Sequence, residues 1–507
     1  MASTMEKSSQ GASETSRHRE VERKFDVVES TVTPSFDGIA AVARVEPASE
    51  QTLDAVYFDT PGRDLAAHHV TLRRRTGGSD AGWHLKLPSG PDARTEVRAP
   101  LGASETEVPE QLRDVVLAIV RDRPLAPVAR ITTNRNVEVL YAADDAALAE
   151  FSDDHVTAWA EDDGEEQHWR EWELELAEDG IAAGTADEAL LERLSNRLLD
   201  AGAVPAGHAS KLARVLDSSA QEEEQPAASS DPVHRAVAEQ VEELLAWDRA
   251  VRADVEDSVH QMRVTTRKIR SLLQSSEASF GLSDDAWILD ELRQLAAVLG
   301  VARDAEVLAE RYERAIEELP KELVRGRVRE RLVEGAHRRY RSGLRKSLAA
   351  MRSQRYFRLL DALEGLVAAD LTPPPGGEPS ADSTIEAGYK RVRKRAKEAK
   401  KAESEHRDEA LHRIRKGAKR LRYTAAATGE KKVSDAAKAI QSLLGEHQDS
   451  VVSRAHLSQQ ADAAHADGED TFTYGVLYHQ EAELAQRCRG QLNSALKALD
   501  KAVDKAL

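Results

Sequence analysis

The chain has 507 residues, 32% of them charged, and a formal net charge of −18. This length predicts roughly two to four domains, each with its own core. The single cysteine, Cys488, excludes an internal disulfide, and we find neither an apolar leader nor an apolar run long enough to span a bilayer. We therefore expect a soluble cytoplasmic protein that does not bind membranes.

The negative charge is confined to the first part of the chain. Residues 1–217 hold 23 Lys and Arg against 41 Asp and Glu, whereas residues 218–507 hold 48 of each kind. Between these parts, residues 218–232 (SSAQEEEQPAASSDP) have the composition of a linker. We predict a disordered tail over 1–18, a first domain over 19–217, a linker over 218–232 and a second domain over 233–507.

The first domain is predicted to be an antiparallel β structure. Segments with period-two alternation, such as VERKF, VTLRRRT, WHLKL and WREWELEL, are separated by clusters of Gly, Pro, Asp and Ser. Their polar sides are nearly all charged, as where Glu20, Glu22 and Lys24 share one side of the first strand. A solvated outer face would explain any single strand. Repetition of the pattern on seven strands favours a barrel with a charged interior that holds a highly charged ligand.

The first domain resembles the CYTH domain, the fold of the triphosphate tunnel metalloenzymes, over roughly residues 18–216. The resemblance is carried by E-x-E-x-K (20–24), YFDT (57–60), LRRR (72–75), LKLP (85–88), E-x-E-x-E (171–175) and SKLARVL (210–216). It implies an eight-stranded antiparallel tunnel that binds triphosphate through Arg and Lys and holds Mg²⁺ or Mn²⁺ through glutamates. The implied residues are Lys24 and Lys86 as catalytic cations, Arg73, Arg75, Arg98, Arg130 and Lys211 as triphosphate ligands, and Glu20, Glu22, Glu171 and Glu173 as metal ligands. Asp153 and Asp154 fall where the family also has acidic residues.

The chemistry of these residues suits hydrolysis of a phosphoanhydride, which needs neutralised charge and an aligned water rather than covalent work by the protein. The same family includes adenylyl cyclases and thiamine triphosphatases, which need a pocket for a base or for thiamine. We find no obvious aromatic pair near the tunnel strands, although Trp83, Trp159, Trp169 and Trp172 keep those alternatives open. Inorganic triphosphate or a longer polyphosphate is the simpler substrate.

The second domain is predicted to be helical and internally repeated. From residue 233 the hydrophobic period is 3.6, and LTPPPGGEPSADS (371–383) divides the domain into halves over about 233–370 and 384–507. The segment HQMRVTTRKIRSLL (260–273) recurs as HRIRKGAKRLRYTA (412–425), 152 residues later. Each copy is followed by Leu-Gly-x-x-x-Asp, at 299–304 and at 444–449. Two copies with one spacing indicate a structural repeat.

Each repeat predicts a cationic stripe on one helix. The stripes consist of His260, Arg263, Arg267 and Arg270 in the first half, and of His412, Arg415, Lys419 and Arg422 in the second. Residues 410–423 contain six basic residues and no acidic residue. Because like charges so placed repel one another, an anionic ligand is a better explanation than a solvated face.

The repeat resembles the CHAD domain, a conserved-histidine helical domain, over about residues 233–500. The resemblance implies two pseudo-symmetric four-helix bundles with a basic cleft that binds inorganic polyphosphate. Ala302 stands in the first half where His447 stands in the second, so the halves need not bind equally. Few aromatic residues are available to stack bases, which makes nucleic acid an unlikely partner.

The hypothesis from the sequence is an α+β multidomain protein, an eight-stranded antiparallel β tunnel followed by an all-α domain of two four-helix bundles. We expect a metal-dependent triphosphatase, a hydrolase, whose helical domain binds polyphosphate and could attach the enzyme to polyphosphate granules. A non-catalytic polyphosphate-binding protein and an adenylyl cyclase remain as alternatives.

Overall fold

The computed structural model describes residues 15–90, 92–102, 104–162, 164–183, 186–217, 232–275, 280, 287–369, 385–403 and 406–506. The predicted tail up to residue 14, the predicted linker up to residue 231 and the Pro-Gly break at 371–383 lie outside these residues. Residues 16–18, which we assigned to the tail, extend the first strand and pair with β6, Ser16 lying opposite Arg98. The chain divides into two compact units, Met1–Thr265 with Ala350–Ala369, and Thr266–Ala349 with Asp370–Leu507.

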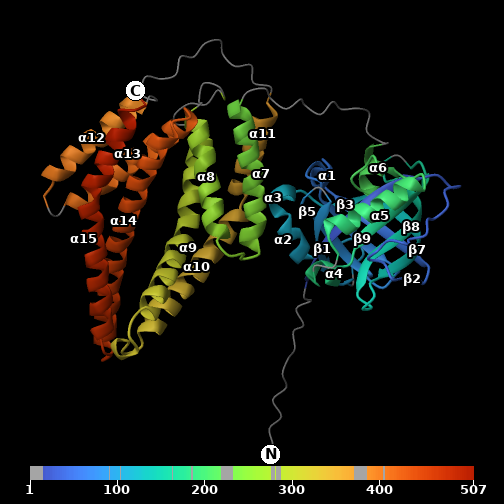
Figure 1. The fold of residues 1–507 in the computed structure, drawn as a ribbon, viewed down its shortest axis with the longest axis horizontal. Helices are drawn as coiled ribbons and strands as arrows, with labels where there is room; N and C mark the ends of the chain where they lie inside the picture. Colours follow the sequence, from blue (N-terminus) through green and yellow to red (C-terminus); the bar gives the residue numbers. More distant parts are fainter. Residues whose placement is uncertain are drawn as a thin grey trace, which may run out of the picture. The chain divides into compact units, whose positions relative to one another are not determined.

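Eight antiparallel strands close into a barrel in the first unit (Figure 1). Around the barrel the order is β1 (Ser16–Val27), β6 (Ala93–Ala99), β5 (Gly82–Pro88), β4 (Thr71–Thr76), β3 (Gln51–Asp59), β7 (Ala126–Tyr141), β8 (Ala147–Ala160) and β9 (Gln167–Leu176), which pairs back to β1. The short strands β2 (Arg44–Pro47) and β10 (Val204–Pro205) pair with β7 and β1. The predicted eight-stranded antiparallel barrel is confirmed.

The apolar sides of several strands face outward, where helices cover them. Phe25 of β1 and Trp172 and Leu174 of β9 pack in one cluster with four leucines of α5 (Glu188–Asp200). The side chain of Asp187 caps α5 by accepting a hydrogen bond from the backbone N–H of Leu190 at 2.8 Å. Each large side chain buried in this way stabilises the fold by about 1.5–3 kcal/mol. The outward apolar sides leave the charged sides to face the interior.

Further helices decorate the barrel. They are α1 (Asp64–Ala67), α2 (Glu110–Val115), α3 (Leu117–Val120), α4 (Glu178–Ala183) and α6 (Lys211–Asp217). The helices α2 and α3 cover β4–β6 through Leu112, Val116 and Ile119. Helix α6 packs instead on inward-facing side chains, since its leucines cluster with Tyr57 and Ile131, which line the barrel interior. It therefore fills one end of the barrel.

Two helices that follow the barrel in the sequence belong to the same compact unit. Helices α7 (Pro232–Arg252) and α11 (Gln354–Ala368) pack together, and α7 also contacts α2 and α3. Asp114 of α2 accepts from Arg252 at 3.2 Å and from Arg352 at 2.9 Å. Arg121, only 3% exposed, pairs with Asp361 and with Glu364, the latter at 2.5 Å.

Most of the remaining described residues are helical. The helices are α8 (Ser258–Ser275), α9 (Trp287–Glu317), η1 (Lys321–Leu323), η2 (Glu330–Glu334), α10 (Gly335–Met351), α12 (Ile385–Lys401), α13 (Arg407–Ala427), α14 (Lys431–Ala466) and α15 (Phe472–Val503). Helices α12–α15 share one core, in which Val392, Ile414, Ile440 and Leu499 are fully buried. The predicted all-helical second part is confirmed. Among the described residues, no helix combines the length and the apolar character needed to cross a membrane.

Candidate functional site

The barrel interior holds a cavity of about 560 Å³ with a highly charged lining. Its cationic side chains are Lys24, Arg73, Arg75, Lys86, Arg94, Arg98, Arg135 and Lys211, and its acidic side chains are Glu20, Glu22, Asp80, Glu96, Glu150, Glu173, Glu175 and Glu178. All but one of the cations predicted for the tunnel are present in this lining. Such a lining suits a small ligand that carries many negative charges together with positive counterions.

Lys24 lies between two carboxylates on neighbouring strands. The pairing of β1 with β9 places Lys24 opposite Glu173. The Lys24 Nζ atom is 2.8 Å from Glu22 and 2.5 Å from Glu173. Burial alone would raise the pKa of Glu22, but Lys24 and Lys86 outweigh it and lower this pKa to about 2. Glu22 is therefore ionised at neutral pH and can hold a cation.

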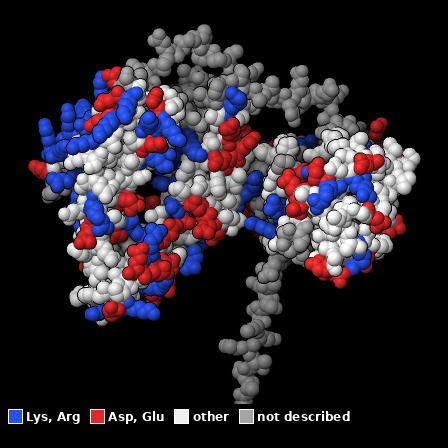
Figure 2. Space-filling model, viewed as in Figure 1, with Lys and Arg blue, Asp and Glu red and all other residues white. Residues whose placement is uncertain are grey.

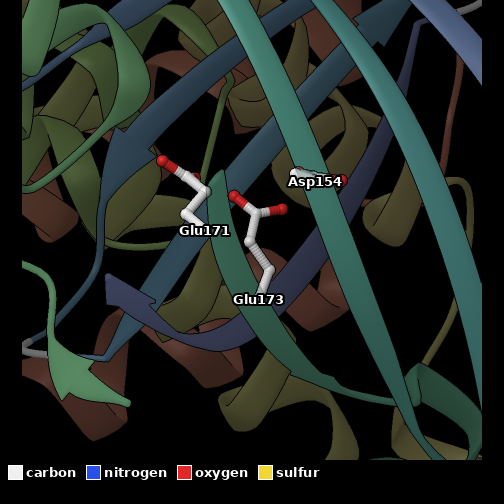
Figure 3. Close-up of side chains that lie close together, drawn as sticks. All are labelled: Asp154, Glu171 and Glu173. Atoms are coloured by element: carbon white, nitrogen blue, oxygen red, sulfur yellow. The ribbon is translucent and has the colours of Figure 1, made fainter. Parts of the chain in front are cut away.

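Asp154, Glu171 and Glu173 form an acidic cluster on β8 and β9 (Figure 3). One oxygen from each lies within 4.8 Å of the others. Lys211, at the start of α6, forms ion pairs with all three, at 2.9 Å, 2.6 Å and 2.7 Å, and donates a hydrogen bond to Glu173. Arg135 also donates to Asp154 at 2.6 Å and to Glu173. Against the effect of burial, Lys211 and Lys24 hold the pKa of Glu173 well below its usual value.

The four predicted metal ligands separate into different groups. Glu171 and Glu173 lie together with Asp154, whose role the sequence left open. Glu20 lies elsewhere, 2.6 Å from Lys86, and Arg98 is 3.7 Å away. Burial raises the pKa of Glu20 despite the opposing effect of Lys86. Oxygen donors of this kind are the ligands that Mg²⁺ and Mn²⁺ prefer.

Arg73 is the cation with the fewest partners in this part of the barrel. Its guanidinium donates one hydrogen bond, to the Tyr57 hydroxyl at 3.3 Å, and its Nε atom is buried without a partner. Within the described residues it makes no salt bridge. The neighbouring Arg75 pairs with Asp80, and Arg98 pairs with Glu96. A half-buried guanidinium without a carboxylate partner favours an anionic ligand.

The prediction that Arg130 lines the tunnel is wrong. Arg130 points out of the barrel, where it forms a two-point ion pair with Asp54 at 2.8 Å and 2.6 Å and lies over the ring of Trp159. Side chains alternate along β7, and the inward set contains Ile131, Thr133 and Arg135. Arg135 supplies the inward cation of this strand instead.

Sequence reasoning also missed Arg94, which lines the cavity and lies 3.4 Å from Glu22. The alternation contained the signal, since Arg94 lies two residues before the inward-facing Glu96. Arg135 was harder to find, because its side of β7 is otherwise apolar or neutral. Asp153, in contrast, pairs with Arg170 at 2.7 Å away from the acidic cluster.

The second cationic stripe lies along α13. His412, Arg415, Lys419 and Arg422 are half-buried positions on one side of α13, and its apolar side packs in the core of α12–α15. The side chain of Arg415 passes over Gly445 of α14. A Cβ atom added to Gly445 would lie 3.4 Å from the Arg415 guanidinium. Lys and Arg also gather over the neighbouring α12 (Figure 2). Burial, followed by Lys416 and Arg415, lowers the pKa of His412, so that its ring is neutral at pH 7.

The first stripe lies along α8. Arg267 is exposed, and His260, Arg263 and Arg270 are half-buried. Arg270 donates to the backbone carbonyl of Leu289 at 3.1 Å. The two copies of the repeat therefore place their cations on corresponding helices.

The two repeats differ where Ala302 in the first corresponds to His447 in the second, and this difference has a steric cause. Ala302 lies where α9 meets α10, and a Cβ added at Gly343 would lie 2.8 Å from the Ala302 Cα atom. An imidazole has no room at such a close crossing. His447 is buried on α14 and receives a hydrogen bond from Arg489 at 3.2 Å.

Comparison with known families and proteins agrees with this architecture. The CYTH domain model matches residues 18–201 and the CHAD domain model matches residues 235–458. The chain belongs to the CYTH–CHAD proteins. Two uncharacterized proteins of Mycobacterium tuberculosis, from strains CDC 1551 / Oshkosh and ATCC 25618 / H37Rv, are each 66% identical over 506 residues, covering 97% of this chain and 98% of theirs.

Two solved structures resemble the separate parts of this CYTH–CHAD protein. The CHAD domain from the plant Ricinus communis is 24% identical, with a TM-score of 0.40, over 53% of this chain and 91% of that one. HpAC1 from Hippeastrum, a proposed adenylyl cyclase with a dominant triphosphatase activity, is 15% identical, with a TM-score of 0.23, over 39% of this chain and 95% of that one. CYTH domains are metalloenzymes that act as triphosphatases or cyclases, and the acidic cluster of this chain can accommodate a metal.

Proposed function

We propose that the CYTH domain hydrolyses inorganic triphosphate in a metal-dependent reaction and that the CHAD domain binds inorganic polyphosphate. The observation that supports this proposal best is the tunnel itself, where the half-buried Arg73 has no carboxylate partner among many other cations. A ligand with several phosphate groups would supply the negatively charged acceptors that these cations can bind.

The metal-binding residues in this proposal are Asp154, Glu171 and Glu173, with Glu22 nearby across Lys24. The donor set fits Mg²⁺ or Mn²⁺, because all of its donors are carboxylate oxygens. The carboxylates are now paired with Lys24, Lys211 and Arg135. When bound, the ion would neutralise phosphate charge and increase the acidity of a water molecule.

The protein's own cations would orient the triphosphate and stabilise its charge. Arg73 and Arg75 lie side by side on the inward side of β4. Lys24 and Lys86 project from β1 and β5 into the same cavity. In such a site, donors that are already oriented stabilise the negative charge that develops on the leaving phosphate. The burial of these groups strengthens each interaction relative to water.

The test measures phosphate release by the full-length protein from triphosphate, ATP and long-chain polyphosphate, with Mg²⁺, Mn²⁺ or a chelator. We expect metal-dependent turnover of triphosphate, and a loss of about 100-fold or more in kcat for Glu173→Gln. Glu161→Gln is the control, because Glu161 directly follows β8, is exposed and does not line the cavity. Triphosphate binding without phosphate release in any metal would contradict the enzyme and leave a polyphosphate-binding protein.

The aromatic side chains favour hydrolysis over cyclisation. Tyr57 is the one aromatic ring among the described residues that line the cavity. Trp83 and Trp172 are fully buried in clusters on the outer side of the barrel. A nucleotide base would thus find little to stack on. Formation of cyclic AMP from ATP in the same assay would contradict this choice.

In this proposal the CHAD domain retains the enzyme near its substrate. A polyphosphate chain carries a charge on nearly every phosphate, and the stripes on α8 and α13 present matching cations. Attachment to polyphosphate granules in the cytoplasm would follow from this binding.

A further inference from the structure

The loop between β4 and β5, residues 77–81, lies at the end of the barrel opposite α6. Contacts with the two ends of strand β3 show where α6 and the loop lie. Tyr57, near one end of β3, clusters with the apolar side chains of α6. Near the other end, Thr52 and Leu53 contact the loop glycines. Since α6 fills one end of the interior, an extended ligand would enter at the end where the loop lies.

The backbone of this loop is tightly held. Gly77 and Gly78 have positive φ values of 79° and 72°. A Cβ added to Gly77 would lie 2.1 Å from the carbonyl oxygen of Thr52, so only glycine fits there. His84 donates from Nε2 to the backbone carbonyl of Asp80 at 2.9 Å. The backbone position of Asp80 is thus independent of its side chain.

The carboxylate of Asp80 pairs with the guanidinium of Arg75 at this end of the tunnel. It forms the one salt bridge that Arg75 makes within the described part of the chain. The Arg75 side chain is 8% exposed and that of Asp80 is 30% exposed. Arg75 lies near Arg73 and Arg135, two cations that repel it. An anion at this position is needed, and Asp80 supplies it while no ligand is bound.

Asp80 also forms part of the wall between two hollows. A second hollow of about 290 Å³ lies outside the tunnel, lined by His18, Gly82 and His84 among others. Ser79, Asp80 and Arg98 line both this hollow and the tunnel cavity. Displacement of the Asp80 side chain would therefore connect the two spaces at the tunnel mouth.

We propose that Asp80 is a displaceable carboxylate at the tunnel mouth, whose place on Arg75 is taken by a phosphate group. A polyphosphate longer than the tunnel then extends past Asp80 into the outer hollow, with its end toward α6. This inference rests on the proposed function and adds to it that the substrate enters end first. It makes Asp80 a residue that sets the preference between short and long phosphate chains.

Charge explains the expected direction of the effect. Asp80 competes with phosphate for Arg75, and its carboxylate repels every further phosphate that passes it. Replacing Asp80 by Asn keeps the shape and removes the charge. Affinity should thus rise for triphosphate, and more for a chain that extends through the mouth.

The experiment compares full-length wild type with Asp80→Asn, using triphosphate and medium-chain polyphosphate as separate substrates. We expect KM for polyphosphate to fall by about 10-fold, and by less for triphosphate. Asp54→Asn is the matched control, because Asp54 also pairs with an arginine and is 32% exposed, but on the outer side of the barrel. A gel of the polyphosphate products should show shortening from the ends rather than internal cuts.

A double variant separates the tunnel from the helical domain, which also binds polyphosphate in our proposal. In an Arg75→Gln background, Asp80→Asn should lose the part of its effect that comes from competition for Arg75 and keep only the smaller part that comes from repulsion of passing phosphates. An effect that arises elsewhere in the protein would keep its full size. A raised KM in Asp80→Asn, an equal change in Asp54→Asn, or an effect of Asp80→Asn that is undiminished without Arg75 would overturn the inference. If wild type binds these anions without hydrolysing them, Kd replaces KM in every comparison. The proposed triphosphatase then fails while Asp80 is still tested.

Discussion

Arg73 is a residue at which binding and stability should oppose each other. In the folded barrel the Arg73 side chain is half-buried, its Nε atom is buried without a partner, and the guanidinium donates only to the Tyr57 hydroxyl. Burying an unpaired charge costs free energy, which a neutral side chain of similar length avoids. Such a residue is retained for what it binds rather than for the fold.

We predict that Arg73→Met raises the thermal midpoint of the protein measured without ligand. The same variant should weaken triphosphate binding by about 100-fold, since it removes a charge-assisted interaction from the partly buried lining of the tunnel. Calorimetry of unfolding and of triphosphate binding checks both effects. Arg130→Met serves as control, because Arg130 lies outside the barrel, and it should leave binding unchanged. A lower midpoint with unchanged binding would mean that Arg73 is structural.

The raised pKa of Glu175 predicts that the stability of the protein depends on pH. Burial raises the pKa of Glu175 from 4.5 to about 8. Lys86 opposes this shift, and the nearby carboxylates of Glu20 and Glu22 add to it. Between these two values the unfolded chain is ionised at this residue and the folded chain is protonated. Unfolding then releases a proton, so the free energy of unfolding falls as the pH rises through this window, by at most about 1.4 kcal/mol per pH unit.

We therefore predict that Glu175→Gln is more stable than wild type at pH 8, and that this advantage shrinks toward pH 5. Urea unfolding in the presence of a chelator measures the difference at each pH. The control is Glu150→Gln, at the exposed cross-strand partner, and its advantage over wild type at pH 8 should be smaller than that of Glu175→Gln. An advantage of Glu175→Gln that is equal at both pH values would show that Glu175 does not retain its proton.

At the scale of residues, alternation predicts most of the tunnel lining but not all of it. The rule that charged sides face inward is correct for β1, β4 and β9. It fails on β7, where Arg130 shares the outward side and the inward side carries Ile131 and Thr133 beside Arg135. A strand with a cation on each side cannot be oriented by charge alone. Its orientation depends on the packing of α6, which no local pattern contains.

At the scale of elements, periodicity predicts the barrel and the helices, because each element repeats its pattern over several turns or strand pairs. The positions of α6 and of the 77–81 loop are not predicted in this way. The loop depends on the contact between Gly77 and Thr52, which are 25 residues apart in the sequence. Contacts between distant segments decide what closes the barrel and what lines its mouth.

The cationic stripe on α13 predicts that polyphosphate binding depends measurably on salt concentration. Each cation that contacts a phosphate releases counterions, so the logarithm of the binding constant falls linearly with the logarithm of salt concentration. Arg415→Gln should weaken polyphosphate binding by the full-length protein and reduce the slope by about one. Arg413→Gln is the control on the same helix, because Arg413 is exposed, lies off the stripe and pairs with Glu409 at 3.9 Å. Equal effects of the two variants would indicate that polyphosphate is attracted by the overall positive charge of the helix rather than bound by the stripe.

At the scale of the whole molecule, the barrel is not structurally independent of the helices that follow it. Helices α7 and α11 lie in the same compact unit as the barrel. Arg252, whose side chain is 2% exposed, reaches Asp114 of α2, and Gln354 donates to Asp122 at 2.7 Å. His260 and Arg263, the first two residues of the α8 stripe, belong to this unit as well. The CYTH domain and the start of the CHAD domain should therefore unfold together.

The ion pairs of Arg121 test this coupling. Asp361, on α11, is half-exposed, so we expect Arg121→Glu to lower the free energy of unfolding by about 2 kcal/mol, less than for a fully buried pair. Urea unfolding of the full-length protein, followed through the tryptophans of the barrel, measures the loss. The reversed pair Arg121→Glu with Asp361→Arg should recover part of it. Arg113→Glu, an exposed change on the neighbouring α2, should stay within about 0.5 kcal/mol of wild type. If the reversed pair is no more stable than Arg121→Glu alone, the barrel does not depend on α11 through this contact.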